Sequence, residues 1–485
     1  MKSGFIQRSR SDRVVSLLLL LAFLTAQAWA TCGGGGGGGM GGMGGGTPEK
    51  VYQVPWKVIS ASDPPQKEGL ALYWFPSSQQ EIDRSSLRNS QTLTLYSQQC
   101  VTMAIVDART PLGQKYSQGE ALPFVVLTAS DGTVIEKAEN KKGFLKVDQV
   151  EKMVESEMKK RESNIKEKFA TAKDRIKAGD NDAAIKELRA VMEQKCMFPG
   201  KAKDAAKELK KLGVTDVADI PSGPNFDPAV MAQVSRTMRE GLKQENAAHY
   251  LDAERLYKAA HALDPADPTP LRYLGELYRH HIGDWDKARA TFNSILAMPA
   301  DPLARAVALH GLGKMTIHEG DFKKGVALME DSVREFPLAL AYRNLAVYWN
   351  SEGDSAKADA YTKLALSLEP KDPYNLIFAA AFMAGNGHTA EALKIARENE
   401  PLLPASYNLA AIYAQAGQKE KALTLLKRHF FEYERYQAVR SKEMMEARVD
   451  AVFAPVKSDP EFIALTSGAD GRLPWTGMNP RPAGQ

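Results

Sequence analysis

The residues of this chain that could do chemistry are few, and the cysteines come first. Of three cysteines, only Cys100 and Cys196 lie in stretches that are expected to fold. Two cysteines are too few for a disulfide scaffold, although an oxidising compartment would allow one bond between them. Cys100 stands at the edge of an expected strand, where a buried structural thiol is the ordinary interpretation. The alternative is a thiol–disulfide or oxidative-folding factor that uses Cys100, alone or with Cys196.

The histidines do not predict a metal site. His280 and His281 are adjacent, and neighbouring side chains on an α-helix point about 100° apart, so the pair is expected on the surface and not around one ion. His310 and His318 are too far apart for a chelate on one helix face. The sequence has no glycine-rich phosphate loop and no H-E-x-x-H, G-x-S-x-G or paired C-x-x-C motif. We therefore expect a protein that is not an enzyme and that uses no cofactor.

A recurring turn is the strongest pattern in the chain. A glycine, four residues and then a small residue that opens an apolar helix recur from Gly179 onward, as GDNDAA, GDWDKA, GDFKKG, GDSAKA, GHTAEA and GQKEKA, with AHYLDA in the same frame. From Ala253 the small residues lie 35, 37, 33, 34 and 30 positions apart. A period near 34 indicates stacked helical hairpins, which bury their apolar faces only against their neighbours.

From about Met231 these units closely resemble tetratricopeptide repeats. The first unit places Gly241, Ala253, Tyr257 and Pro265 at that family's small, aromatic and proline positions, and the second has one residue inserted in its turn. The resemblance implies a helical solenoid in which small residues let paired helices approach closely and a proline ends each second helix.

The same resemblance implies a concave groove lined by first-helix residues. The residues at the lining positions are Arg272, Arg279, His280, His310, Lys314, Arg343, Asn344, Asn350, Tyr407 and Asn408. Basic and amide side chains there would suit an acidic peptide or a C-terminal carboxylate. Tyr407 and the alanines of the last two units are expected to add apolar contact. The alternative for each residue is ordinary solvated surface.

Residues 48–160 read as a mixed α/β domain. Strands are expected at 70–75, 101–107 and 123–128, with a hairpin turn at Asp131-Gly132 and a polar helix over 77–96. This order resembles the thioredoxin fold, in which a cis-proline would stand at Pro123. The resemblance places that family's C-x-x-C motif at Ser77–Glu81, where there is no cysteine. The implied domain is therefore redox-inactive by the family mechanism.

The N-terminus predicts export. Lys2, Arg8, Arg10 and Arg13 precede an apolar run and Ala28-Trp29-Ala30, which is the layout of a secretory signal peptide. Cys32 and the glycine run after it resemble a bacterial lipoprotein start, so soluble export to the periplasm and lipid anchoring in the cell envelope both stay open. The apolar run is short for a membrane span.

The predicted fold class is thus an α/β thioredoxin-like domain followed by an all-α solenoid. The expected segments are a signal peptide (1–30), a glycine-rich tether (31–47), the α/β domain (48–160), a charged helical hairpin (161–213), a linker (214–228), the repeat array (229–434), capping helices (435–467) and a disordered tail (468–485). The net charge is only +4, so nucleic acid is not an expected partner. We expect a protein or peptide partner with acidic segments.

Overall fold

The computed structural model describes residues 51–59, 69–117, 119–140, 143–403, 406–433 and 437–467. The expected signal peptide, the glycine-rich tether with Cys32 and the C-terminal tail lie outside these residues. The chain divides into two compact units at Leu338/Ala339. Within the part of the chain that the structure describes, no helix combines the length and the apolar character needed to cross a membrane.

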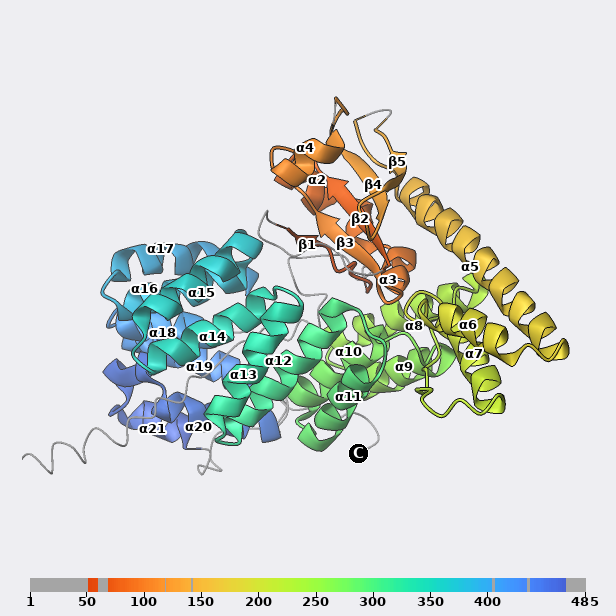
Figure 1. The fold of residues 1–485 in the computed structure, drawn as a ribbon. Helices are drawn as coiled ribbons and strands as arrows, with labels where there is room; N and C mark the ends of the chain where they lie inside the picture. The colour runs from red at the N-terminus through yellow and green to blue at the C-terminus, as the bar shows by residue number, and fades with distance from the viewer. Residues whose placement is uncertain are drawn as a thin grey trace, which may run out of the picture. The chain divides into compact units, whose positions relative to one another are not determined.

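The first unit begins with a five-stranded sheet (Figure 1). Its strands are β1 (Lys57–Val58), β2 (Leu70–Phe75), β3 (Val101–Ile105), β4 (Phe124–Ala129) and β5 (Val134–Ala138). The sheet order is β1-β3-β2-β4-β5; β3 runs parallel to β1 and β2, and β4 runs antiparallel to β2 and β5. Side chains alternate along β2, so that Leu72 and Trp74 enter one apolar cluster and Phe75 enters another on the opposite face. The Leu122–Pro123 bond is cis, as the resemblance implied.

The helix expected over 77–96 is instead broken into three short pieces. These are α2 (Gln79–Arg84), a 3-10 turn (Ser86–Asn89) and α3 (Gln91–Ser97). Each piece begins after a serine whose hydroxyl accepts a backbone N–H of the next turn, namely Ser78, Ser85 and Ser90. Serine side chains that hydrogen-bond nearby backbone groups end one helix and begin another. A further helix, α4 (Pro111–Ser117), has no counterpart in the sequence-based expectation.

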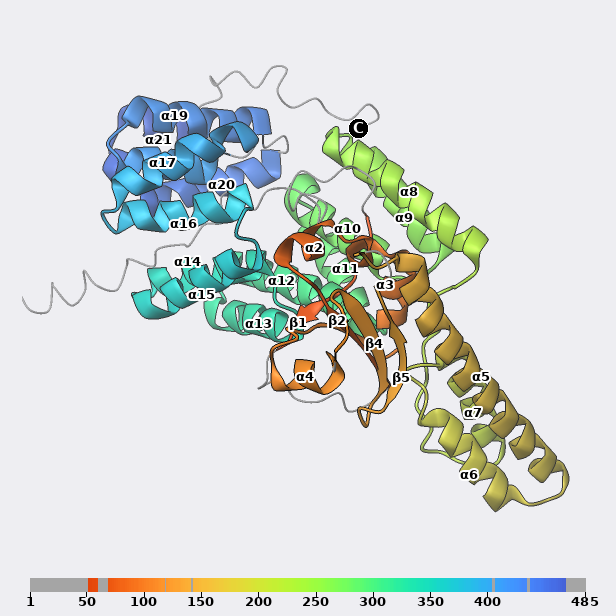
Figure 2. The ribbon, with the colours of Figure 1, turned by 90° about the horizontal axis from the view of Figure 1, so that it is seen from above.

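Three charged helices follow the sheet: α5 (Val147–Lys177), α6 (Asn181–Met192) and α7 (Pro199–Lys211). Both views show the long α5 running beside α6 and α7 (Figures 1 and 2). Their shared core contains Ile165, Ala172, Leu188, Ala205 and Leu209. Most of their charged side chains face solvent, as the mixed-sign charge pattern predicts.

The repeat array of the first unit has three hairpins. They pair α8 (Pro228–Asn246) with α9 (Tyr250–Leu263), α10 (Thr269–Glu276) with α11 (Trp285–Ala297), and α12 (Pro302–His318) with α13 (Phe322–Glu335). The glycine of the recurring turn has a positive φ wherever it occurs, for example 75° at Gly283 and 98° at Gly320. The aspartate after it caps the second helix, since the Asp284 and Asp321 side chains each accept a backbone N–H of the first helical turn.

Close approach of the helices depends on two glycines around one phenylalanine. A Cβ atom on Gly275 would lie 2.3 Å from the Phe292 ring, and a Cβ atom on Gly311 would lie 2.3 Å from its other edge. Phe292 is fully buried between α10 and α12. The small residues of the pattern therefore make room for the large apolar residue of the same unit.

The second unit continues with three hairpins and a C-terminal cap. The hairpins are α14 (Ala339–Ser351) with α15 (Ser355–Leu368), α16 (Pro373–Gly385) with α17 (Thr389–Asn399), and α18 (Tyr407–Gln415) with α19 (Lys419–Arg428). The cap consists of a π-helical turn (His429–Tyr433), α20 (Gln437–Val449), a 3-10 helix (Ala451–Val456) and α21 (Pro460–Thr466). One apolar cluster joins the last two hairpins to the cap.

Candidate functional site

The structure buries most of the residues that the sequence assigns to the concave face. In the first unit, Arg272 and His310 are 2% exposed and Lys314 is 9% exposed. In the second unit, Arg343, Asn344 and Tyr407 are also buried, Asn408 is half-buried and Asn350 is exposed. This differs from the open polar lining that the spacing predicts.

Arg279 is compensated within its own helix. Its guanidinium Nη2 lies 2.5 Å from Oε2 of Glu276, and both side chains are largely shielded from solvent. Burial acts to raise the pKa of Glu276, but the positive charge of Arg279, with smaller effects of His310 and His280, lowers the pKa overall. Arg279 is therefore committed to an ion pair and is a weak candidate for partner binding.

Arg272 and Lys314 are different, because their charges have little compensation. Among the described residues, neither side chain takes part in a hydrogen bond or a salt bridge, and Nε of Arg272 is buried without a partner. The guanidinium lies 5.7 Å from the Tyr273 ring, and it acts electrostatically on the buried Asp301. Burying a polar group without a hydrogen bond costs free energy, so Arg272 is left partly unsatisfied at Nε, whereas Nζ of Lys314 is not among the buried atoms without a partner.

The residue inserted in the second unit forms a π-helical segment, Leu277–Ile282, and not a longer turn. This winding stacks the His280 and His281 rings, whose centroids lie 4.9 Å apart. It also brings His281 against the Tyr250 ring and to 3.8 Å from Oε1 of Glu245. His281 is buried, so the expectation that both histidines are on the surface is wrong. No group of three metal-binding side chains occurs among the described residues.

The chain's own N-terminal segment covers part of α10. Tyr52 donates a hydrogen bond to Oδ2 of Asp267 over 2.7 Å, and Tyr273 donates one to the carbonyl oxygen of Val51 over 3.2 Å. Gln91 of α3 donates to the Tyr52 hydroxyl and to the carbonyl oxygen of Met231. The α/β domain is thus fixed to the first two hairpins of the array. The sequence gives no local signal for this contact.

Two carboxylates in the turn before α10 accept hydrogen bonds from the segments that contain Tyr52 and Asn225. Asp264 accepts a hydrogen bond from the backbone N–H of Asn225, and Asp267 accepts from Tyr52 and from the backbone N–H of Thr269. Burial raises the pKa of Asp267 to about 6, although the hydrogen bonds from Tyr52 and Thr269 oppose that rise. This turn is therefore the point at which the α/β domain and the linker meet the array.

Removing the Tyr52 hydroxyl should weaken this contact. In Tyr52→Phe the Asp267 carboxylate stays buried but loses a donor, which typically costs about 1.5–3 kcal/mol. The free energy of unfolding, measured in urea, should fall by that amount. Tyr73→Phe is a matched control because the Tyr73 hydroxyl is not part of this interface. An equal loss in both variants would contradict the role given to Tyr52.

The raised pKa of Asp267 predicts how the free energy of unfolding changes with pH. The folded state binds the proton more tightly than the unfolded state, whose pKa is near 3.8. This group's contribution to stability is therefore fully present below that value and is lost as the pH rises through about 6. The change amounts to at most about 3 kcal/mol. Urea unfolding of the parent and of Asp267→Asn across this pH range should show that the difference in their free energies of unfolding changes with pH by up to that amount.

The C-terminal cap covers the last expected groove residue. Tyr407 donates a hydrogen bond to Asp450 over 3.2 Å and packs edge-on against Phe453 at 5.0 Å between ring centroids. Gln415, also on α18, donates to the carbonyl oxygen of Val452 over 2.8 Å. Tyr407 therefore supports the cap, and it does not offer the open apolar contact that we expected.

The segment in the place of the C-x-x-C motif caps a helix. The Ser78 hydroxyl accepts the backbone N–H of Glu81, and the Glu81 carboxylate accepts the backbone N–H of Ser77, both over 3.2 Å. The first bond is the N-cap bond of a capping box, and the second is shifted by one residue, since Glu81 accepts from Ser77 and not from the N-cap Ser78. The side chains at this place accept hydrogen bonds from backbone N–H groups at the start of α2, and none of them is a thiol.

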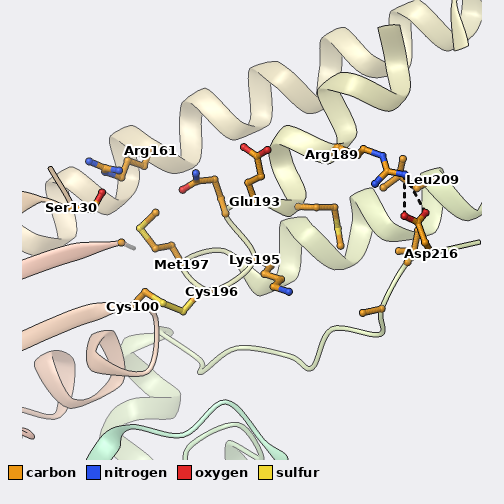
Figure 3. A pocket seen from close by; sticks show the side chains of 15 residues that line it. Cys100, Ser130, Arg161, Arg189, Glu193, Lys195, Cys196, Met197, Leu209 and Asp216 are labelled. Carbon is orange, nitrogen blue, oxygen red and sulfur yellow. Dashed lines mark hydrogen bonds and ion pairs between the residues drawn. A yellow bond between two sulfur atoms is a disulfide. The ribbon is translucent and has the colours of Figure 1, made fainter. Parts of the chain in front are cut away.

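Cys100 and Cys196 are joined in a disulfide, with their Cα atoms 5.8 Å apart. The expectation of a buried structural thiol at Cys100 is therefore wrong. The bond links the strand edge of the α/β domain to the turn between α6 and α7, and it lies on the wall of a cavity of about 690 Å³ (Figure 3). Across that cavity, Arg189 forms an ion pair with Asp216.

The stacked hairpins define this chain as a helical repeat protein. The closeness of paired helices at small residues and the repeated Gly-Asp turns fit the tetratricopeptide type.

Comparison with known proteins agrees with this class. The sequence matches no protein-family model. It is 24% identical over 261 residues to the Protein CTR9 homolog of Arabidopsis thaliana; the match covers 43% of this chain and 23% of that protein. The chain thus spans about a quarter of the relative's length.

Proposed function

We propose that this chain is an exported, non-catalytic scaffold that binds an acidic segment of a protein partner on the concave face of its repeat array. A thioredoxin-like domain without the redox motif is fixed to that array. The order of the five strands and the cis bond before Pro123 support the thioredoxin-like assignment. The helix cap formed by Ser78 and Glu81 at this place supports a loss of the redox function there.

The cations Arg272 and Lys314, which have no hydrogen bond or salt bridge among the described residues, carry the proposal. They lie on the first helices of two consecutive hairpins, α10 and α12, which pack against each other. A carboxylate of a partner would supply the charge and the hydrogen bonds that both side chains lack. Because both are buried in the free chain, a partner must first open the face. The Val51–Tyr52 segment over α10 is the part of the chain best placed to move.

The disulfide supports the proposed location. Disulfides form and persist in oxidising compartments such as the periplasm, and they are rare in the reducing cytosol. A signal peptide ending at Ala30 would deliver the chain there, and Cys32 would be the lipid attachment site in the anchored alternative. Mass analysis of the mature N-terminus separates cleavage after Ala30 from an acylated Cys32.

Affinity capture with neutral variants tests the proposed site. The parent chain and the double variant Arg272→Gln, Lys314→Gln are incubated with an envelope extract, and bound proteins are identified. The matched control, Lys323→Gln and Lys324→Gln, removes the same charge from exposed positions on α13. We expect a partner with an acidic segment to be retained by the parent and the control and lost from the double variant. Equal retention by all three folded chains would refute the site.

A further inference from the structure

The Cys100–Cys196 disulfide lies at the N-terminal end of strands β2 and β3. The segment in the place of the C-x-x-C motif lies at the opposite end of β2. Strands β2 and β3 are parallel, and Leu70 pairs with Val101 where both begin. Gly69 and Cys100 stand just before these residues, whereas Ser77–Glu81 follows the other end of β2. The disulfide is therefore separate from the slot at which thioredoxin-like proteins carry their thiols.

Solvent reaches this bond. Both cysteines are half-buried and line the cavity of about 690 Å³, together with Gly69 and Met197 (Figure 3). Gly69 packs directly against Cys100, since a Cβ atom on Gly69 would clash with the Cys100 carbonyl oxygen at 2.1 Å. A cavity of this size admits a small molecule, because ligand pockets typically measure about 300–1,000 Å³.

The surroundings of Cys196 favour a thiolate. Lys195 precedes it and is exposed, whereas Arg161 and Arg189, which line the same cavity, are paired with Glu157 and Asp216. The N-terminus of α7 begins three residues further on, at Pro199, and the N-cap residue Phe198 provides no side-chain hydrogen bond. Nearby cations and a helix N-terminus both stabilise a thiolate. Cys196, which has Lys195 and the start of α7 beside it in the chain, is taken as the leaving group below.

The turn that carries Cys196 has a second attachment to the α/β domain. Met197 is 5% exposed and belongs to the apolar cluster of the sheet, and Phe198 packs against the same cluster. Phe198 also packs against the core of α5, α6 and α7. The two cysteines therefore stay close to each other when the covalent bond is broken.

We propose that Cys100–Cys196 is a thiol-exchange site, at which a dithiol reduces the bond reversibly in the folded protein. One thiolate of the dithiol attacks Sγ of Cys100, the S–S bond breaks, and Cys196 leaves as a thiolate that takes a proton from water. The second thiol then attacks the dithiol's own sulfur in the mixed disulfide. Cys100 is released as a thiol, and the dithiol ends as a cyclic disulfide that has given two electrons to the protein.

The rate of reduction under native conditions tests this proposal. Dithiothreitol is added to the full chain without denaturant, samples are quenched by alkylation, and the blocked thiols are counted by mass. We expect reduction within about tenfold of the rate for oxidised glutathione under the same conditions, with the circular dichroism spectrum unchanged. After the reductant is removed, oxidised glutathione should restore the bond. Reduction that occurs only at denaturant concentrations that unfold the α/β domain would overturn the proposal and leave a structural disulfide.

Two charge-reversal variants test whether the positive charge of Lys195 speeds the reduction of the disulfide. Lys195→Glu should slow reduction about three- to tenfold at low salt, because it destabilises the Cys196 thiolate and repels the attacking thiolate. Lys207→Glu makes the same charge change at an exposed position on α7 away from the cavity, and its rate should match the parent. Equal slowing in the two variants would contradict the role of Lys195. This outcome is independent of partner binding at Arg272 and Lys314.

Discussion

Replacing Cys100 and Cys196 together by serine is expected to lower the free energy of unfolding of the first unit by about 4–5 kcal/mol. The bond closes a loop of 96 residues, and the loss of chain entropy in the unfolded state grows with loop length. The bond also joins two modules that otherwise meet through side chains such as Met197 and Phe198.

Urea unfolding followed by circular dichroism measures this effect. The same loss should appear when the parent protein is unfolded in the presence of a reductant, because both treatments remove the same cross-link. The reductant should not change the unfolding of the double-serine variant. A loss below about 1 kcal/mol in the variant would show that the cross-link does not constrain the unfolded chain as the loop-entropy account requires.

Phe292→Ala is expected to cost about 3–5 kcal/mol. The ring is fully buried, and Gly275 and Gly311 contact it from two neighbouring helices. Neither glycine has a side chain that could move into the empty space, so the cavity should persist. The loss should be concentrated in α10, α11 and α12.

Hydrogen exchange read by peptide is the measurement for Phe292→Ala. Amides of α10–α12 should exchange faster, while those of the sheet should keep their protection. Phe292→Leu fills part of the space and should lose less. Gly311→Ala should also destabilise, by about 1–3 kcal/mol, because the added methyl meets the ring. A stable Phe292→Ala variant with unchanged exchange would mean that the crossing at Phe292 does not hold these helices together.

The repeated architecture could be predicted because its signals are local. The residues of each Gly-Asp turn determine its conformation locally, because the glycine accepts a positive φ and the aspartate side chain caps the next helix. The small residues at the helix crossings were also visible, since they recur with a regular period. The broken helix before β3 was missed because three serine caps, Ser78, Ser85 and Ser90, outweigh the helical pattern of that stretch.

The candidate site depended on contacts between distant residues, and these leave no local pattern. Asp267 reads as an ordinary turn residue, and its hydrogen bond to Tyr52 spans 215 positions. The positions of Arg272 and Lys314 within their repeats could be counted from the sequence. That both side chains are buried could not be predicted. Likewise, the sequence showed that one disulfide was allowed, while the pairing needed the turn before α7 to pack beside β3.

Hydrogen exchange of the full chain with a captured partner bound tests the central proposal most directly. An acidic segment that engages Arg272 and Lys314 should slow exchange in α10 and α12. The same binding should speed exchange in residues 51–56, since Val51 and Tyr52 must leave α10. Both changes should be absent with Arg272→Gln, Lys314→Gln. Protection confined to the second helices α11 and α13, with α10 and residues 51–56 unchanged, would contradict binding on the concave face.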